Sequence, residues 1–190
     1  MSILFTKCND YIIREADISE EDKDIIKYGL RQLPLILSAI FSFIMIAIVI
    51  GKMGESVLYI AAFCSIRVYA GGYHASTQLR CYAISVFTVV NSLLIIKYMN
   101  INDMICICSI ILLCVVIAFF SPVQDINKPL DDIERKVYKK RAIVVMIGWC
   151  IFSILLFVFG LDKWLNCVFI AIVQLLFFVL AGLIKSKYTS

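Results

Sequence analysis

The only histidine of the chain, His74, lies seven residues before Cys81 in the stretch RVYAGGYHASTQLRC. A cysteine attacks carbonyl carbons as its thiolate, and a neighbouring imidazole can remove the thiol proton. In one straight helix these residues would share a face but lie about 10 Å apart, whereas general-base contact requires about 3 Å. A Cys–His site therefore predicts a bend in the chain at Gly71 and Gly72 and across residues 75–79.

Each of these residues also has an ordinary structural explanation. A single loop histidine is commonly a solvated side chain, and a cysteine at a helix start commonly packs against its neighbours. Arg67 and Arg80 could extend to lipid phosphates, and the glycine pair could simply end a helix. What favours catalysis is the combination, because most other cysteines lie in apolar runs. Those cysteines lack the spacing of zinc ligands, so no metal is expected.

The composition requires a membrane protein. Of 190 residues, 62% are hydrophobic and 17% are charged, and the mean hydropathy is +0.95, which is more apolar surface than a soluble domain can bury. Two short apolar runs, Ser56–Ile66 and Tyr82–Ile96, are either the second and third crossings or a re-entrant pair. We expect an all-α integral membrane protein with about six transmembrane helices. Four longer runs can each cross a hydrocarbon core of about 30 Å: Leu33–Ile50, Met104–Val123, Ala142–Leu161 and Trp164–Ile184.

The segments outside the apolar runs divide the chain. Ser19 with Asp22 is typical of a helix start, and apolar residues at helical spacing follow, which predicts an amphipathic helix on the inner leaflet. We expect residues 1–32 to be a cytosolic arm without a cleaved signal, 33–184 to be one membrane-embedded catalytic domain, and 185–190 to be a short cytosolic tail. The loops 67–81 and 124–141 would be cytosolic.

The basic residues indicate the orientation. Six crossings with a cytosolic N-terminus leave only Lys52, Lys97 and Lys163 of the 18 basic residues in outer loops, as the positive-inside rule prefers. A re-entrant pair would move only Arg67 and Arg80 outward, so both arrangements stay open. Either one places both termini in the cytosol of a multi-pass protein.

A basic segment precedes the fifth expected crossing. KPLDDIERKVYKKR is predicted to be a helix with Pro129 in its first turn and an apolar stripe of Leu130, Ile133 and Val137. It could be anchored by lipid charges, or it could recruit an acidic peptide. Its basic face consists of Arg135, Lys136, Lys139, Lys140 and Arg141.

The first of two sets of notable residues is Arg67, Tyr69, Ala70, Gly72, His74, Ala75 and Cys81. The second is Ser121 and Pro122 followed by Asn127, Lys128 and Pro129. Both sets resemble motifs of the AgrB family of bacterial integral-membrane cysteine endopeptidases, which serve peptide quorum sensing; the second is similar to the proline motif of that family, and the length and hydropathy of the chain fit the family from end to end.

The resemblance implies a reaction. Cys81 would be the nucleophile and His74 the general base, cutting an AgrD-type propeptide near its C-terminus through a thioester on Cys81. A cysteine or serine of the propeptide would then close a thiolactone or lactone ring. Arg67 and Gly72 would shape the site, with Arg67 holding either a carboxylate or the oxyanion.

The resemblance also implies partners. The basic face of 124–141 would dock the acidic tail of the propeptide, membrane lipids would surround the protein, and a second copy would complete a dimer in the bacterial cell membrane. No cofactor and no nucleic acid is expected. A third residue that orients His74 is not identified, although Ser76, Thr77 and Gln78 are nearby polar candidates.

The rival hypothesis is a non-enzymatic membrane peptide transporter or signalling scaffold. Transporters usually place ionisable groups inside their spans, whereas these spans offer only Asn91, Asn166, Gln174 and hydroxyl groups. The chain also lacks the phosphate-binding motif that powers export by nucleotide hydrolysis. Both observations favour the enzyme, although a passive facilitator would be compatible with them.

Overall fold

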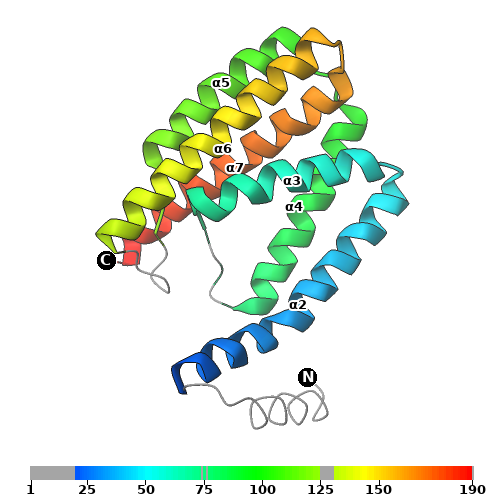
Figure 1. Cartoon of the computed structure of the whole chain (residues 1–190). Coiled ribbons are helices and arrows are strands. Elements are labelled where there is room, and N and C mark those ends of the chain that lie inside the picture. The colour runs from blue at the N-terminus through cyan, green and yellow to red at the C-terminus, as the bar shows by residue number, and fades with distance from the viewer. Residues whose placement is uncertain (1–19, 74, 76, 125–130, 190) are drawn as a thin grey trace. The chain divides into compact units, whose positions relative to one another are not determined.

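The computed structural model describes residues 20–73, 75, 77–124 and 131–189. These residues form helices and no strand, which confirms the predicted all-α class (Figure 1). The chain divides into two compact units, Met1–Met45 and Ile46–Ser190. The described helices are α2 (Glu20–Ile50), α3 (Met53–Ala70), α4 (Gln78–Tyr98), α5 (Asp103–Phe120), α6 (Asp132–Val158) and α7 (Asp162–Thr189).

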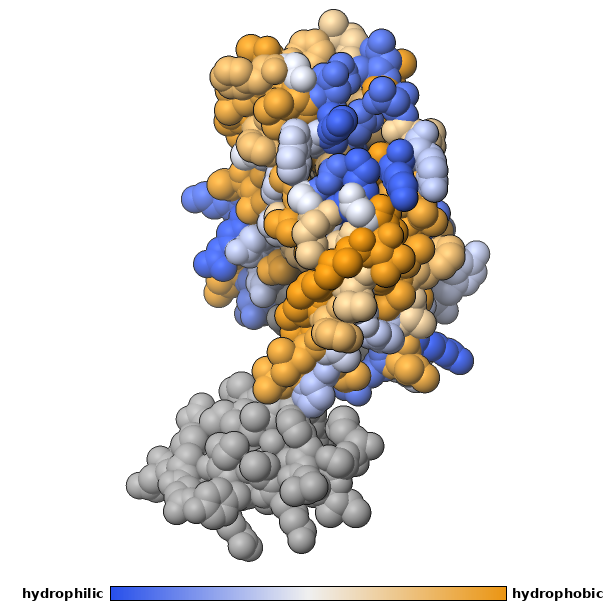
Figure 2. All heavy atoms as spheres, turned by 90° about the vertical axis from the view of Figure 1, so that its right-hand side faces the viewer, coloured by the Kyte–Doolittle hydropathy of each residue, from blue (hydrophilic) through white to orange (hydrophobic). Residues whose placement is uncertain are grey.

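Five of the described helices are long and apolar enough to cross a membrane, α3 being the exception. Many of their large hydrophobic side chains are exposed, and Figure 2 shows a broad hydrophobic surface on one face of the molecule. Such a surface is stable against lipid tails. The chain is therefore a multi-pass membrane protein. The five apolar segments are Leu33–Ile50, Gln78–Tyr98, Asp103–Phe120, Asp132–Val158 and Asp162–Tyr188.

The two short apolar runs of the sequence lie inside longer continuous helices. Ser56–Ile66 is the centre of α3, which has 18 residues, and Tyr82–Ile96 is the centre of α4, which has 21. At about 1.5 Å per residue, α3 is roughly 27 Å long, close to the thickness of a hydrocarbon core. Both helices are longer than half a bilayer, but only α4 is also apolar enough to count as a span.

The amphipathic segment expected before the first span belongs to the same helix as that span. α2 runs from Glu20 through Pro34 to Ile50 without a break. Ser19, the predicted N-cap, lies outside the described residues. The helical spacing of apolar residues before Leu33 continues directly into the uncharged run, so one helix accommodates both patterns.

The basic segment likewise forms the first turns of a span. α6 begins with a capping box in which the Asp131 side chain accepts from the Asp132 N–H at 2.7 Å and Glu134 accepts from the Asp131 N–H at 3.2 Å. This cap satisfies backbone donors at the helix start, so the helix begins at Asp132. Pro129, the predicted first-turn residue, lies outside the described residues.

Within the unit Ile46–Ser190, α7 is the central helix. α5, α6 and α7 run side by side, while α3 packs across α6 and α7 and α4 packs on α7 (Figure 1). The core between them contains Ile66 of α3, Ile110 of α5, Met146 of α6 and Leu175 of α7. Because α7 contacts four other helices, its last turns can reach the loops that those helices enter or leave.

Candidate functional site

The chain breaks between α3 and α4, as a Cys–His site requires. α3 ends at Ala70, and both glycines that follow have positive φ, 75° at Gly71 and 127° at Gly72. Such values favour glycine because it has no Cβ. The break is shorter than predicted, because Leu79 already lies in the first turn of α4. His74 and Ser76 lie outside the described residues.

Cys81 lies in the first turn of α4. Thr77 is the N-cap, with extended backbone, and its hydroxyl accepts a hydrogen bond from the Arg80 N–H at 3.3 Å. The Cys81 N–H donates to the Thr77 carbonyl at 3.0 Å. The Cys81 side chain is half-buried, while Thr77 and Gln78 are exposed. Thr77, a candidate third residue, therefore caps the helix that carries Cys81.

The two segments that carry the family resemblance meet in space. The Val123 N–H donates to the Ala70 carbonyl at 2.9 Å, and Val123 forms an isolated parallel bridge with Gly71. A Cβ on Gly71 would collide with the Val123 carbonyl oxygen. Ser121 and Pro122, joined by a cis peptide bond, are buried beside this contact. The later part of the proline motif, residues 127–129, lies outside the described residues.

Arg67 fixes the loop from inside the unit Ile46–Ser190, called the helical unit below. Its Nη2 donates to the Tyr73 carbonyl at 2.6 Å, and its guanidinium carbon lies 4.4 Å from the ring centroid of Phe178 and 5.6 Å from that of Phe63. Both distances suit cation–π attraction. The guanidinium is near enough to Cys81 to interact with a charge on its sulfur. Arg67 thus connects the residue before His74 to the predicted nucleophile.

One nitrogen of Arg67 has no partner in the part of the chain that the structure describes. Nη1 is buried and makes no hydrogen bond there, although leaving a buried donor unsatisfied costs about 1–3 kcal/mol. Nη2 and the two aromatic rings hold the guanidinium in place, so Nη1 is a fixed donor. A carbonyl or carboxylate oxygen from a bound peptide could satisfy it.

Helix α7 completes the site with residues that the sequence did not single out. The Tyr73 N–H donates to the Phe178 carbonyl at 2.8 Å, and the Nζ of Lys185 lies 5.5 Å from the Tyr73 ring centroid. Gly182 lies against the backbone of Gly72. One signal was available, because an isolated glycine inside a helical run often marks close packing. A second signal concerned α3: Phe63 and Arg67 are four residues apart, so the ring and the guanidinium lie on one face of that helix.

The basic residues predicted to dock a substrate are all exposed in the first turns of α6. Tyr138 lies between these basic residues in the chain, and its ring centroid lies 6.2 Å from that of Tyr69 in the last turn of α3. This contact places the basic turns at the same end of the helical unit as Gly71 and Arg67. The residues are Arg135, Lys136, Lys139, Lys140 and Arg141.

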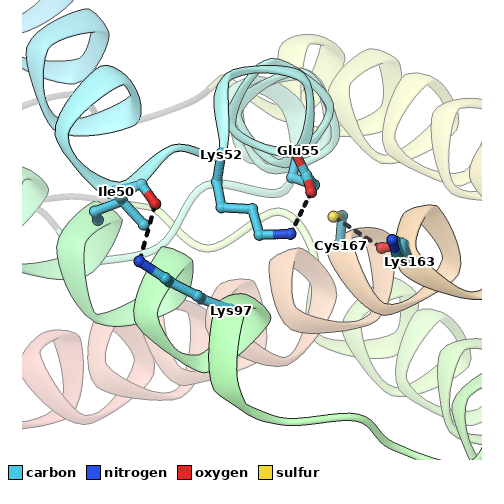
Figure 3. A network of polar contacts seen from close by, with 6 residues as sticks. All are labelled: Ile50, Lys52, Glu55, Lys97, Lys163 and Cys167. Atoms are coloured by element: carbon cyan, nitrogen blue, oxygen red, sulfur yellow. Dashed lines mark hydrogen bonds and ion pairs between the residues drawn. The ribbon is translucent and has the colours of Figure 1, made fainter.

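The opposite end of the helical unit gathers the three lysines that the sequence assigned to outer loops (Figure 3). Lys52 forms a 2.6 Å ion pair with Glu55, and Lys97 Nζ donates to the Ile50 carbonyl at 3.1 Å. Lys163 interacts electrostatically with Glu55, and its carbonyl accepts from Cys167 Sγ at 3.0 Å. The basic residues at this end are thus separated from the loop 71–77 by the length of α3.

These features define a multi-pass helical membrane protein that carries a cysteine, a half-buried arginine and two glycines of positive φ at one end. The sequence model of the accessory gene regulator B family matches residues 5–180, so the chain belongs to the AgrB family, which takes part in quorum-sensing peptide processing. The chain is 24% identical over 161 residues to "Putative AgrB-like protein 1" of Clostridium perfringens (strain 13 / Type A), covering 83% of each protein. No solved structure matches it.

Proposed function

We propose that this chain is a membrane-embedded cysteine endopeptidase that cuts an AgrD-type propeptide and supports its cyclisation. The observation that carries the proposal is the position of Cys81. It lies in the first turn of α4, on the side of half-buried Arg67, and follows the loop that contains the only histidine of the sequence.

In the first step His74 takes the proton of the Cys81 thiol, and the thiolate attacks the carbonyl carbon of the scissile peptide bond. The C–N bond breaks, and the imidazolium gives its proton to the departing amine of the C-terminal tail. The N-terminal part of the propeptide remains bound to Cys81 as a thioester.

In the second step a thiol or hydroxyl of the propeptide attacks the thioester carbonyl after losing its proton to His74. The C–S bond to Cys81 breaks, and Cys81 leaves as a thiolate that regains the proton. Exchange between two thiols is nearly balanced in free energy and requires no ATP. Water would give a linear acid instead, so a site at the membrane edge that limits water favours the ring.

Arg67 has two roles in this proposal. Through Nη2 and the Tyr73 carbonyl it holds the residue next to His74. Through Nη1, which has no partner among the protein atoms, it binds the carbonyl oxygen of the substrate as negative charge develops there. Donors fixed toward such an oxygen lower the barrier of acyl transfer.

The exposed basic turns of α6 dock the acidic tail that is released. They lie at the end of the helical unit that carries Arg67 and Gly71, as the ring contact of Tyr69 with Tyr138 supports. The membrane also concentrates both reactants, because the propeptide leader and the enzyme share one surface. The family resemblance adds a homodimer, which crosslinking in native membranes would detect.

We further propose that this end of the helical unit faces the cytosol, as do both termini. The charge distribution supports this orientation, because Lys52, Lys97 and Lys163 lie at the opposite end and the denser basic residues lie here. A membrane-impermeant thiol reagent should reach Cys81 only in inside-out vesicles. Labelling of Cys81 from outside intact cells would contradict this orientation.

The decisive experiment is co-expression with the propeptide in membranes. We expect Cys81→Ala to abolish tail release and thioester formation, and His74→Ala to reduce both by at least about 100-fold. Cys64→Ala is the matched control, since Cys64 is an exposed thiol that also interacts with Arg67, and it should process normally. Tail release by a correctly inserted Cys81→Ala protein would rule out the mechanism and favour a transporter or scaffold.

A further inference from the structure

Gly72 and Tyr73, at the start of the loop that precedes Cys81, are held by α7, more than 100 residues later in the sequence. Two backbone contacts join them directly: a hydrogen bond from Tyr73 to Phe178 and a close approach of Gly72 to Gly182. The Phe178 ring also lies against the guanidinium of Arg67 in α3, which bonds the Tyr73 carbonyl. None of these contacts involves a residue with a chemical role in the proposed reaction other than Arg67. Their common effect is to fix where the loop runs.

Where the loop crosses α7, the two backbones are too close for a side chain at Gly182 and leave very little space for one at Gly72. A Cβ on Gly182 would lie 2.8 Å from both the carbonyl carbon of Gly72 and the nitrogen of Tyr73. A Cβ on Gly72 would lie 3.0 Å from the Phe178 carbonyl oxygen. These neighbours are backbone atoms, which cannot rotate away as a side chain does. Both glycines are buried, so the loop itself would have to move.

Phe178 contacts the loop and its arginine at once. Its carbonyl accepts the Tyr73 N–H at 2.8 Å, which is possible inside a helix because a carbonyl has two lone pairs. Its ring lies 4.4 Å from the guanidinium carbon of Arg67, whose Nη2 bonds the Tyr73 carbonyl. Tyr73 is therefore held at both its N–H and its carbonyl. Tyr73 directly precedes His74 in the chain.

We propose that Phe178 and Gly182 of α7 are positioning residues that fix Gly72 and Tyr73, the residues that lead directly into His74 in the chain. This inference rests on the proposed cysteine endopeptidase function. Neither residue has a bond-making role in the proposed reaction. Gly182 provides the space in which the loop approaches α7. The Phe178 carbonyl binds the Tyr73 N–H, and the Phe178 ring packs against Arg67.

The first test is Gly182→Ala, matched by Gly148→Ala. Both changes place alanine in a helix, but a Cβ on Gly148 meets nothing within 4 Å. In membranes containing the propeptide, and normalised to folded enzyme, we expect Gly182→Ala to lower kcat by at least about 10-fold with KM changed less than twofold. Gly148→Ala should keep both constants. Alkylation of Cys81, followed by mass spectrometry, should slow in Gly182→Ala only.

The second test is Phe178→Leu, matched by Phe177→Leu. The two residues are adjacent in α7, but Phe177 is 63% exposed and Phe178 lies against Arg67. Phe178→Leu keeps the backbone carbonyl and removes the ring, so a kcat loss of about 3- to 10-fold is expected. Phe177→Leu should process normally. This pair decides the matter if Gly182→Ala does not insert or fold.

The outcomes separate the inference from the function on which it rests. If Cys81→Ala abolishes tail release while Phe178→Leu and a folded Gly182→Ala keep wild-type kcat, the endopeptidase stands and the positioning role of α7 is wrong. An equal kcat loss in Phe177→Leu would also overturn it, since the effect would not be specific to the loop. If Cys81→Ala still releases the tail, the endopeptidase itself is wrong.

Discussion

The two ends of the helical unit satisfy their polar groups in different ways. At the Lys52 end, Lys52 pairs with Glu55 and Lys97 bonds the Ile50 carbonyl (Figure 3). At the Gly71 end, Arg67 is half-buried, and its buried Nη1 has no hydrogen-bond partner among the described residues. A buried donor without an acceptor is costly in a finished structure, and this cost supports the proposal that a ligand binds at the Gly71 end.

The two ends also use glycine differently. Gly51 and Gly71 both have positive φ, 74° and 75°, and Gly71 has ψ of −150°. A Cβ on Gly51 meets nothing within 4 Å, whereas one on Gly71 would collide with Val123. Gly51 therefore serves only its own turn, while Gly71 also lets a distant segment approach. Tight backbone contacts between segments concentrate where the chain positions functional groups.

The largest expected effect comes from breaking this glycine contrast. Gly51→Ala incurs about 1–2 kcal/mol of left-handed strain. Gly71→Ala places alanine in a region of φ and ψ that is essentially confined to glycine and adds a clash with the Val123 backbone. We expect Gly71→Ala to reduce tail release by at least about 100-fold, and Gly51→Ala to leave it within about twofold. Release is measured per folded enzyme, with thermal unfolding in detergent as the check on folding. Equal effects of the two variants would refute the contrast.

The next largest effect comes from the Arg67 guanidinium, whose Nη1 has no hydrogen-bond partner among the described residues. Lysine keeps the charge of Arg67 but lacks the planar fork that reaches two acceptors. Arg67→Lys should therefore lose one charge-assisted hydrogen bond, worth about 1.5–3 kcal/mol, and slow thioester formation by about 10- to 100-fold. Lys52→Arg at the opposite end is the control and should process normally. Wild-type rates in Arg67→Lys would show that Arg67 contributes only its charge.

The smallest effect concerns the exposed charges. Lys139→Glu with Lys140→Glu should raise KM for the propeptide by about 3- to 10-fold without changing kcat, and added salt should shrink the difference. Lys97→Glu with Lys163→Glu makes the same change of charge at the other end and should leave KM unchanged. If KM is insensitive to Lys139 and Lys140, the basic turns of α6 serve lipid anchoring instead.

Much of the fold follows from the sequence because a membrane helix is recognised from one continuous apolar run of the chain. Uncharged runs of sufficient length predicted where the spans lie. The charge pattern assigned Lys52, Lys97 and Lys163 to outer loops, and these three lysines lie together at one end of the helical unit. The need for a bend between His74 and Cys81 followed from the helical rise alone. The exact ends were less predictable: α4 begins earlier than expected, since Thr77 caps it, and the amphipathic and basic segments merged with their neighbouring spans.

The composition of the site was decided in part by tertiary structure. The sequence by itself determined the membrane class, the family and the candidate residues Cys81, His74 and Arg67, because these depend on composition, spacing and motif. Only the folded chain brought Phe178, Gly182 and Val123 to the loop. These contacts join segments separated by tens to more than 100 residues, and neither hydrophobic periodicity nor charge records which helix carbonyl a distant N–H will meet. That choice depends on how α3 and α7 cross, which packing of the whole unit fixes.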